Sequence, residues 1–278
     1  MSGDYEKRML RVINYIFENT DGDLSLDALA DVAAMSRFHW HRVFHGITGE
    51  TCAQAVRRIR LHRAACWLIQ SDWPIAKVAR KSGYPNVQSF NRVFQTSYGR
   101  GPGAFRKLGK PGLSPMKPLK GKSIMFTVEI RKAEARRIVG LAHKGAYLEI
   151  GQAFEKVSAI ATSRGLWPNV KSMLGLYYDD PSAVAEADLR SFAALEVSAD
   201  MALPDGLEEM NVAKGDVAVL LFTGPYSGLK AAYDYLYGDW LPNSGREIRD
   251  APSYEVYLNS PMDTAPEDLL TEICVPLV

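Results

Sequence analysis

Apolar and polar residues follow two different patterns along the chain. As far as residue 107, apolar residues recur three and four positions apart, which is the spacing of one face of an α-helix. The predicted helices cover residues 10–17, 26–33, 38–44, 52–70, 75–79 and 87–94. Ser25 or Asp27 supplies a capping side chain for the second of these helices.

Beyond residue 123, short apolar segments with strand-like alternation replace the helical pattern. The predicted strands are Ile124–Arg131, Met173–Tyr178, Ser191–Val197, Val217–Phe222, Tyr254–Leu258 and Glu272–Pro276, and the predicted helices are Ile150–Arg164 and Leu229–Leu241. The two patterns predict an all-α domain followed by an α+β domain.

A basic segment rich in Pro and Gly separates the two patterns. Residues 107–123 (KLGKPGLSPMKPLKGKS) hold three Pro, three Gly and five Lys, and they show no apolar period. Such a composition is typical of a semi-extended linker. We therefore expect domains at 1–108 and 124–278 joined by a linker at 109–123. A long surface loop inside one domain is the alternative interpretation.

The helical part contains an internal duplication. Leu29–Ala33 (LADVA) resembles Ile75–Ala79 (IAKVA), and Arg42–Phe44 (RVF) recurs as Arg92–Phe94. Each copy predicts a short helix, a turn and a second helix that carries an arginine, which is the layout of a helix-turn-helix. Two copies joined by the long helix 52–70 would present two recognition helices to successive major grooves of DNA, ~34 Å apart.

The second half contains another duplication, at an offset of 79 residues. Gly145-Ala-Tyr147 matches Gly224-Pro-Tyr226, and Tyr178 matches Tyr257. Each copy predicts a strand, a Gly-x-Tyr turn, a helix and two strands. Two such βαββ units would form an antiparallel sheet with helices on one face and a cleft between the copies. Coincidence is the alternative for so few matches, but their agreement with the order of elements favours a duplication.

Composition places the chain among ordinary globular proteins. Its 278 residues are 47% hydrophobic and 23% charged, which excludes a disordered chain. Three cysteines without C-x-x-C spacing exclude a disulfide scaffold. No apolar run approaches the ~18–20 residues that a membrane span needs, and the N-terminus lacks the apolar region of a signal peptide. We expect a cytoplasmic protein without a membrane partner.

The net charge of +1 conceals a division between the two halves. Residues 1–123 hold 20 Lys and Arg against 9 Asp and Glu, a net charge of +11. Residues 124–278 hold 13 against 23, a net charge of −10. A basic first half is typical of a protein that binds a polyanion, because neutralised phosphates release their counterions. The two halves are therefore expected to have different partners.

Residues 25–107 resemble the AraC/XylS family of bacterial transcription regulators. The resemblance rests on SLDALADVAAMSRFHWHRVF in the first unit and on IAKVARKSGY, SFNRVFQ and the segment YGRGPGAFR in the second. The chain departs from the family at Gly101, where Thr is usual, and at Ala33-Ala34-Met35, where Gly is usual. The resemblance implies a seven-helix double helix-turn-helix fold that binds the major groove of double-stranded DNA.

Residues 124–278 resemble the GyrI-like (Rob/BmrR-type) effector-binding domains. The resemblance rests on Gly145-Ala-Tyr147, Gly175–Pro181 (GLYYDDP), Tyr254–Leu258 (YEVYL) and the segment TEICVP near the C-terminus. This resemblance implies paired βαββ modules, in agreement with the second duplication, and a small-molecule effector as ligand.

By the first resemblance, side chains of both recognition helices reach DNA bases. Trp40, Val43 and Phe44 form the predicted buried stripe of the first helix, which leaves the polar residues around them facing outward. Arginine suits guanine, glutamine suits adenine, and an aromatic ring suits a thymine methyl group or a sugar. The candidate DNA-binding residues are Arg37, Phe38, His41 and Arg42 in the first unit and Gln88, Ser89 and Arg92 in the second, and all of them except Arg37 are expected to reach bases.

The three histidines of the segment HWHRVFH raise the possibility of a metal site. His41 and His45 lie four residues apart, but no cysteine or carboxylate joins them nearby. We favour a polar DNA-facing surface and expect neither a metal nor a cofactor.

The second half is rich in tyrosine, and one glutamate stands out among the aromatic residues. In the GyrI-like family the Glu of the Tyr-x-Tyr strand supplies a negative charge, and here that residue is Glu255. Alternation along a strand puts Glu255 and Tyr257 on one face and Tyr254 and Val256 on the other. Aromatic rings with one acid suit a cationic or amphiphilic aromatic ligand. The candidate ligand-binding residues are Glu255, Tyr147, Trp167, Tyr177, Tyr226 and Tyr257.

The leading hypothesis is a sequence-specific transcriptional regulator whose second domain senses a small molecule, with RNA polymerase as a further expected partner. Two alternatives stay open at this stage. Some GyrI-like proteins are hydrolases, and Glu255 with Tyr147 or Tyr226 has the residue types for acid–base chemistry. In the other alternative, the second domain binds no small molecule and serves only to dock a protein.

Overall fold

The structure, a computed structural model, describes residues 3–108 and 125–278, so the predicted linker 109–123 lies outside the described residues. Contacts divide the chain into two compact units. Of the described residues, the helical unit holds Gly3–Ala34 and residues 48–108, and the sheet unit holds Met35–Ile47 together with residues 125–278. The predicted domain boundaries stay a prediction, and one segment, Met35–Ile47, groups with the second half of the chain.

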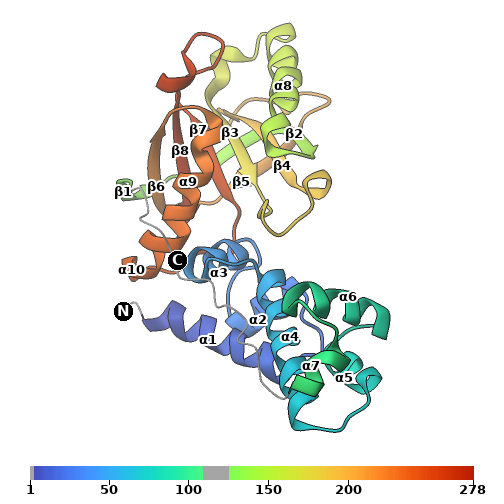
Figure 1. The fold of residues 1–278 in the computed structure, drawn as a ribbon. Helices are drawn as coiled ribbons and strands as arrows, with labels where there is room; N and C mark the ends of the chain where they lie inside the picture. Colours follow the sequence, from blue (N-terminus) through green and yellow to red (C-terminus); the bar gives the residue numbers. More distant parts are fainter. Residues whose placement is uncertain (1–2, 109–124) are drawn as a thin grey trace. The chain divides into compact units, whose positions relative to one another are not determined.

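The first part of the chain is helical, as the sequence predicts. Its helices are α1 (Gly3–Glu18), α2 (Leu26–Ala33), α3 (Trp40–Thr48), α4 (Cys52–Gln70), α5 (Ile75–Lys81), α6 (Val87–Tyr98) and α7 (Pro102–Leu108) (Figure 1). Ser25 caps α2 by accepting from the Ala28 amide. Arg37 and Phe38 lie in the turn before α3 rather than within the helix, where the sequence placed Phe38.

The helical unit is built around α4. Thr51 and Gln54 form a capping box that starts α4 by satisfying backbone amides at its first turn. Farther along α4, Leu68 packs with Phe90, Phe94 and residues of α5 and α7 in a buried apolar cluster. Helices α5 to α7 therefore rest on the second half of α4. None of the helices in the described residues combines the length and apolar character that crossing a membrane requires.

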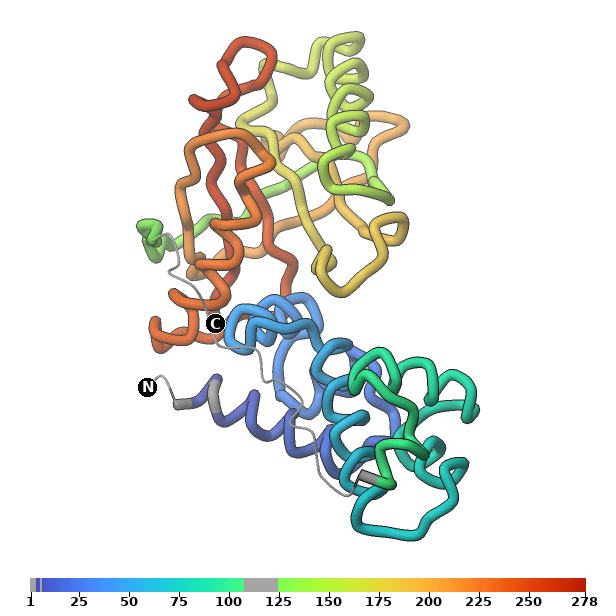
Figure 2. The backbone as a smooth tube through the Cα atoms, viewed as in Figure 1, coloured from blue at the N-terminus to red at the C-terminus, as the bar shows by residue number. Residues whose placement is uncertain are grey.

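The sheet unit contains one eight-stranded antiparallel sheet in the order β1-β6-β8-β7-β3-β4-β2-β5. The strands are β1 (Val128–Ala133), β2 (Arg136–Lys144), β3 (Val170–Tyr177), β4 (Arg190–Val197), β5 (Glu208–Val212), β6 (Gly215–Thr223), β7 (Ser253–Tyr257) and β8 (Leu270–Pro276). Strands β7 and β8, which belong to the red end of the backbone in Figure 2, lie within the sheet and not at its edge.

The order of strands confirms the duplication at an offset of 79. Shifted by that offset, β2 falls on β6, which spans Gly215–Thr223. Each copy contributes three adjacent strands, and the copies meet where β3 pairs with β7. The first strand of each copy pairs with the other copy, since β1 lies beside β6 and β5 lies beside β2. The predicted paired βαββ units are therefore present, each with one additional strand.

The predicted strand segments include neither β2 nor β5. β5 (EEMNV) is a short edge strand with exposed acids and almost no apolar alternation. In β2 (RRIVGLAHK), Gly140 interrupts the apolar run, and a Cβ there would lie within 2.0 Å of the Ala193 carbonyl oxygen. The glycine thus permits the close approach of β2 to β4, which single-strand periodicity does not indicate.

Helices α8 (Gly151–Ser163) and α9 (Leu229–Tyr235) cover the same face of the sheet. Phe154 of α8 meets the Tyr257 ring of β7 edge-on, with centroids 5.4 Å apart. Tyr233 of α9 donates to Glu255, the neighbour of Tyr257 on that face. A π-helical turn (Leu236–Trp240) and the short helix α10 (Leu241–Ser244) continue α9. Tyr254 and Val256 point to the opposite face, into a separate apolar cluster, as alternation predicts.

A departure from the AraC/XylS pattern gives a testable consequence for stability. Ala34 caps α2 at its C-terminal end in the left-handed conformation, with φ 50° and ψ 52°. A Cβ makes this conformation unfavourable by about 1–2 kcal/mol relative to glycine. We expect Ala34→Gly to raise the free energy of unfolding by about 1 kcal/mol in urea titrations. Ala33→Gly, inside the helix, serves as control and should lower it by about as much.

Candidate functional site

The sheet brings Glu255 and a group of tyrosines together at the junction of its two copies. Glu255 on β7 lies opposite Gly175 on β3. A Cβ on Gly175 would come within 2.8 Å of the Tyr257 hydroxyl and 2.9 Å of the Tyr177 hydroxyl. Since glycine leaves this space open, the two hydroxyl groups meet at 2.6 Å. The junction between the copies is thus shaped for polar groups over Gly175.

The Glu255 carboxylate is buried and held by tyrosine hydroxyls. Only 3% of the residue is exposed. Tyr233 donates to Oε1 and Tyr257 donates to Oε2, each at 3.0 Å. A tyrosine hydroxyl has one proton, and Tyr257 donates that proton to Glu255. Tyr177 is therefore the donor in the hydrogen bond between the two tyrosines. These contacts fix both carboxylate oxygens.

Burial governs the charge state of Glu255. It raises the pKa of the carboxyl to about 7, although the hydroxyl bonds and the nearby Arg42 charge oppose the shift. Burial also raises the pKa values of Tyr177, Tyr233 and Tyr257, and the Glu255 charge adds to that increase. The three tyrosines are therefore neutral hydroxyl donors, and within this cluster of four residues Glu255 is the one that titrates near neutral pH.

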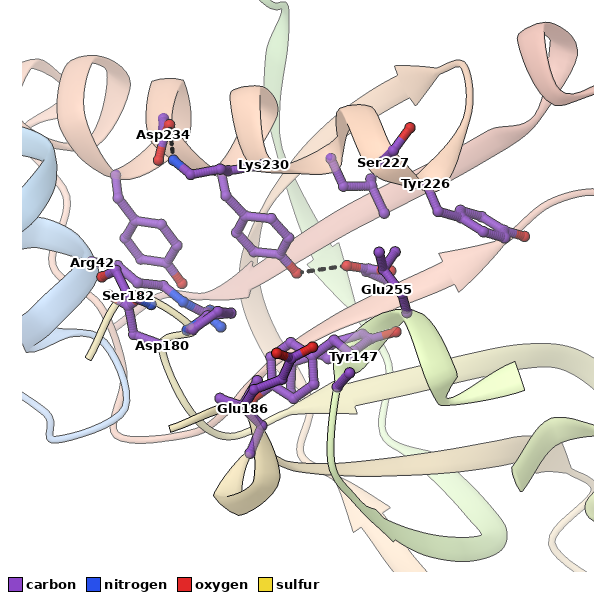
Figure 3. Close-up of a pocket in the computed structure, with 18 of the residues that line it drawn as sticks. Arg42, Tyr147, Asp180, Ser182, Glu186, Tyr226, Ser227, Lys230, Asp234 and Glu255 are labelled. Carbon is purple, nitrogen blue, oxygen red and sulfur yellow. Dashed lines mark hydrogen bonds and ion pairs between the residues drawn. The ribbon is translucent and has the colours of Figure 1, made fainter. Parts of the chain in front are cut away.

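A cavity of about 550 Å³ opens beside Glu255. Figure 3 shows lining residues from several elements around it, with Tyr147 and Glu186 on one side and Ser227 and Lys230 on the other. Five tyrosines and four acids are among the residues that line it. The polar and aromatic lining residues are Arg42, His45, Tyr147, Tyr177, Asp180, Ser182, Glu186, Tyr226, Ser227, Lys230, Tyr233, Asp234, Tyr237 and Glu255.

Tyr147 and Tyr226 occupy equivalent turns of the two copies, and both line the cavity. The Tyr147 hydroxyl donates to the Asp179 carbonyl at 2.9 Å and accepts from the Asp179 amide at 2.8 Å, and burial raises its pKa to about 12. The Tyr226 ring meets Tyr257 edge-on at 5.6 Å. The Gly-x-Tyr turns therefore place one aromatic ring at each side of the cavity.

Five of the six candidate ligand-binding residues are brought together, and Trp167 is not. Four of them, Glu255, Tyr147, Tyr177 and Tyr226, line the cavity. The fifth, Tyr257, donates a hydrogen bond to Glu255. Trp167 lies in a short 3-10 turn after α8, where it is 41% exposed and donates to Thr162. Aromatic composition alone does not indicate in which direction a ring points.

The sequence prediction missed Tyr233 and Tyr237, which form one wall of the cavity. They lie four residues apart on α9 and its π-helical continuation, with rings nearly parallel at 6° and centroids 6.3 Å apart. The i, i+4 spacing puts both on one helix face, and Tyr233 is the repeat equivalent of Phe154. The spacing and the repeat equivalence together could have predicted that these two tyrosines form a wall of the cavity.

The predicted base-reading residues near α3 lie against the sheet unit. Trp40, Val43 and Phe44 are fully buried, as predicted, but His41 is only 8% exposed instead of facing outward. Arg37 is exposed, and its guanidinium lies over the Phe38 ring. The centroids of the Phe38 and Tyr178 rings are 6.4 Å apart.

Two polar residues of the same segment also differ from the outward-facing surface that the sequence predicts. His39 is fully buried, and Arg42 lines the cavity. His39 Nε2 donates to the Ala251 carbonyl at 2.7 Å, so Nδ1 accepts from the Tyr237 hydroxyl at 2.8 Å. Burial lowers the pKa of His39 to about 3, which keeps the ring neutral.

The candidate residues of α6 have the arrangement that a base-reading helix needs. Asn86 caps the helix by accepting from the Ser89 amide at 2.8 Å. Gln88 and Arg92 are exposed and lie one turn apart on the same face. Ser89 is half-buried, and its hydroxyl donates to the Asn86 carbonyl. Phe90 and Phe94 anchor the opposite side of the helix in the core.

A helix-turn-helix region combined with a pocket-bearing duplicated sheet defines a class of two-part binding proteins. Residues 126–278 match the family described as GyrI-like small molecule binding domain, and residues 29–108 match a helix-turn-helix domain family. The chain belongs to the GyrI-like family and carries an AraC-type helix-turn-helix region in its first half.

Similar curated proteins match the helix-turn-helix part. The uncharacterized HTH-type transcriptional regulator YbfP of Bacillus subtilis is 32% identical over 106 residues, which are 38% of this chain and 36% of YbfP. The regulatory protein SoxS of Salmonella typhimurium is 33% identical over 95 residues, which are 34% of this chain and 89% of SoxS. AdaA of Bacillus subtilis, a bifunctional transcriptional activator and DNA repair enzyme, is 33% identical, with 47% of its length matched. The chain thus spans about a third to a half of the length of YbfP and AdaA.

Similar solved structures match the sheet part. The EcmrR C-terminal domain is 14% identical with a TM-score of 0.46, covering 56% of this chain and 99% of that one. SAV2435 bound to tetraphenylphosphonium is 14% identical with a TM-score of 0.42, covering 55% and 94%.

The raised pKa of Glu255 predicts a pH-dependent stability. Its carboxyl has a pKa of about 7 when folded against 4.5 ordinarily. Between these values the folded state binds more protons, so stability falls as the pH rises and the loss is complete above pH 7. Glu255→Gln should therefore match the wild type at pH 4 and exceed it by about 3 kcal/mol at pH 8.

Chemical denaturation at both pH values measures this difference. The pKa of His39 shifts in the opposite direction, but His39 is present in both proteins. Its contribution to stability therefore cancels in the difference between the wild type and Glu255→Gln. A difference that does not change with pH would contradict the burial account of Glu255.

Proposed function

We propose that this protein is a transcriptional regulator that binds double-stranded DNA through its helix-turn-helix region and a small organic cation through the GyrI-like pocket. The observation that carries the proposal is the buried Glu255 carboxylate in a tyrosine-lined cavity. The family memberships support both halves of the proposal, since one family binds small molecules and the other is a helix-turn-helix family. RNA polymerase stays a predicted further partner.

The chemistry of the cavity favours an aromatic or amphiphilic cation as ligand. Tyrosine rings present the negative face of their π-systems to a cation, a contact worth about 2 kcal/mol when desolvated. Glu255 adds a full negative charge at the floor of the cavity once it is ionised. Asp180, Glu186 and Asp234 also line the cavity, so its acids outnumber its two permanent cations, Arg42 and Lys230. A volume of about 550 Å³ suits a drug-sized molecule.

The first part of the chain supplies the chemistry for DNA. Residues 1–123 carry a net charge of +11, which favours contact with phosphates. Gln88 and Arg92 project from α6 as donors suited to adenine and guanine. Arg37, Phe38, His41 and Arg42 stay proposed for the first reading helix.

A hydrolase is a second candidate function, because Glu255 has a pKa of about 7 beside tyrosine hydroxyls. A carboxyl poised near neutral pH is suited to general acid–base catalysis. Turnover of an electrophilic ring compound that disappears in Glu255→Gln would favour the enzyme. Stoichiometric binding without turnover would favour the sensor.

Cation binding should follow the ionisation of Glu255. Tetraphenylphosphonium is a suitable probe, because its positive charge is permanent and its surface is aromatic. We expect its affinity to rise about tenfold per pH unit below pH 7 and to level off above it. Calorimetric titration from pH 5 to pH 8 measures this profile.

Glu255→Gln should weaken tetraphenylphosphonium binding at least tenfold at pH 8 and flatten the profile, since the amide cannot become charged. Glu155→Gln, on the exposed side of α8, is the matched control and should behave as the wild type. An unchanged affinity in Glu255→Gln would remove Glu255 from the ligand site.

Arg92 is the sharpest test of the DNA half. Arg92→Ala should cost about 1–3 kcal/mol on the preferred operator and relax the preference at one base pair. Arg100→Ala, an exposed arginine just after α6, should weaken binding to all sequences equally or not at all. Selection of binding sites from a random DNA library measures both effects. An unaltered sequence preference in Arg92→Ala would exclude a base-reading role.

A further inference from the structure

Segment 36–46, which the sequence assigns to DNA reading, is attached to the sheet unit by specific contacts. The Ser36 hydroxyl donates to Asp250 at 2.7 Å. His39 bridges the Tyr237 hydroxyl and the Ala251 carbonyl. These polar groups are paired in defined geometry, which distinguishes the contact from loose apolar packing.

A glycine pair brings α3 against the π-helical turn of the sheet unit. A Cβ added to Gly46 would lie 2.5 Å from the Gly238 Cα, a distance that requires the backbone to move. In Figures 1 and 2 the blue α3 segment lies beside the orange turn that follows α9. The side of α3 that meets the π-helical turn therefore leaves no space for a larger residue at position 46.

Arg42 extends from α3 into the pocket (Figure 3). Its guanidinium donates to the Ser253 hydroxyl at 2.6 Å and to the Asp179 carbonyl at 2.8 Å. The same group lies 4.9 Å from the Tyr233 ring centroid and 5.5 Å from the Tyr237 ring centroid. Arginine stays protonated in proteins, so a permanent cation occupies this position.

The Arg42 charge also reaches Glu255, whose pKa it lowers against the effect of burial. Arg42 thus meets both features that a cationic ligand would use, the tyrosine wall and the buried acid. Two positive charges in one cavity repel each other, and Arg42 already lies over the Tyr233 and Tyr237 rings that a ligand cation would use. A ligand cation and Arg42 are therefore competitors.

We propose that Arg42 is the resident cation of this pocket, which an organic cation displaces on binding. This inference rests on the proposed ligand class and adds a specificity-determining residue to it. The displaced residue belongs to the segment that is expected to read DNA, so ligand binding weakens the attachment of α3 to the sheet unit. By linkage, whatever detaches α3 must tighten ligand binding by the same factor.

Replacing Arg42 tests the competition directly. Arg42→Gln removes the charge and keeps a side chain of similar length. In calorimetric titrations of the full chain at pH 8, we expect it to bind tetraphenylphosphonium about tenfold more tightly than the wild type. Arg164→Gln is the matched control, since Arg164 is an exposed arginine at the end of α8 and does not line the cavity. It should leave the affinity unchanged.

Gly46→Ala provides an independent second variant, because it keeps the arginine at position 42 and moves α3, and Arg42 with it, through a backbone clash with Gly238. It should also tighten binding of tetraphenylphosphonium. In the wild type, the probe should accelerate hydrogen exchange of α3 amides, and in both variants exchange should be fast before the probe is added.

Equal or weaker affinity in Arg42→Gln and Gly46→Ala, with normal binding by the wild type, would overturn the competition and leave the proposed ligand class standing. Absence of binding by the wild type and by both variants would overturn both proposals. Binding by the variants alone would support the competition in its strongest form.

Discussion

The structure depends on the burial of one carboxyl group, that of Glu255. An isolated carboxylate in an apolar interior is costly, so the surrounding fold must hold it with donors or leave it protonated. Tyr233 and Tyr257 supply the donors, and burial still raises the pKa to about 7. The group is therefore poised between two charge states beside the permanent charge of Arg42, and a bound organic cation would favour the ionised state.

The duplicated fold explains how this position arises. Two copies meet where β3 pairs with β7, and Gly175 lies opposite Glu255 at the seam. Its missing side chain leaves space for the Tyr177 and Tyr257 hydroxyls. The equivalent of Glu255 in the first copy is Leu176, so a nearly symmetric scaffold carries a single acid. This asymmetry gives the cavity one charged side.

Much of the architecture follows from local patterns, and the site follows only in part. Helical periodicity predicts the first half, and the 79-residue offset predicts the paired sheet modules with Tyr147, Tyr226 and Glu255 at corresponding turns and strands. Trp167 shows where composition fails, since its ring turns outward after α8.

Arg42 shows the deeper limit of prediction from sequence. Its position in a duplicated helix-turn-helix unit suggests DNA contact, whereas its partners Asp179 and Ser253 lie 137 and 211 residues away. Periodicity and repeats report on neighbours along a helix or strand, and they carry no information about such distant pairings. The same arginine therefore has one role suggested by its sequence context and another suggested by its contacts.

The most direct test of the account is a crystal structure of the full chain with tetraphenylphosphonium. The account predicts the probe against Tyr233 and Tyr237 beside Glu255, with the Arg42 guanidinium withdrawn from Ser253 and Asp179. A probe bound in the cavity while Arg42 keeps both of these hydrogen bonds would contradict it.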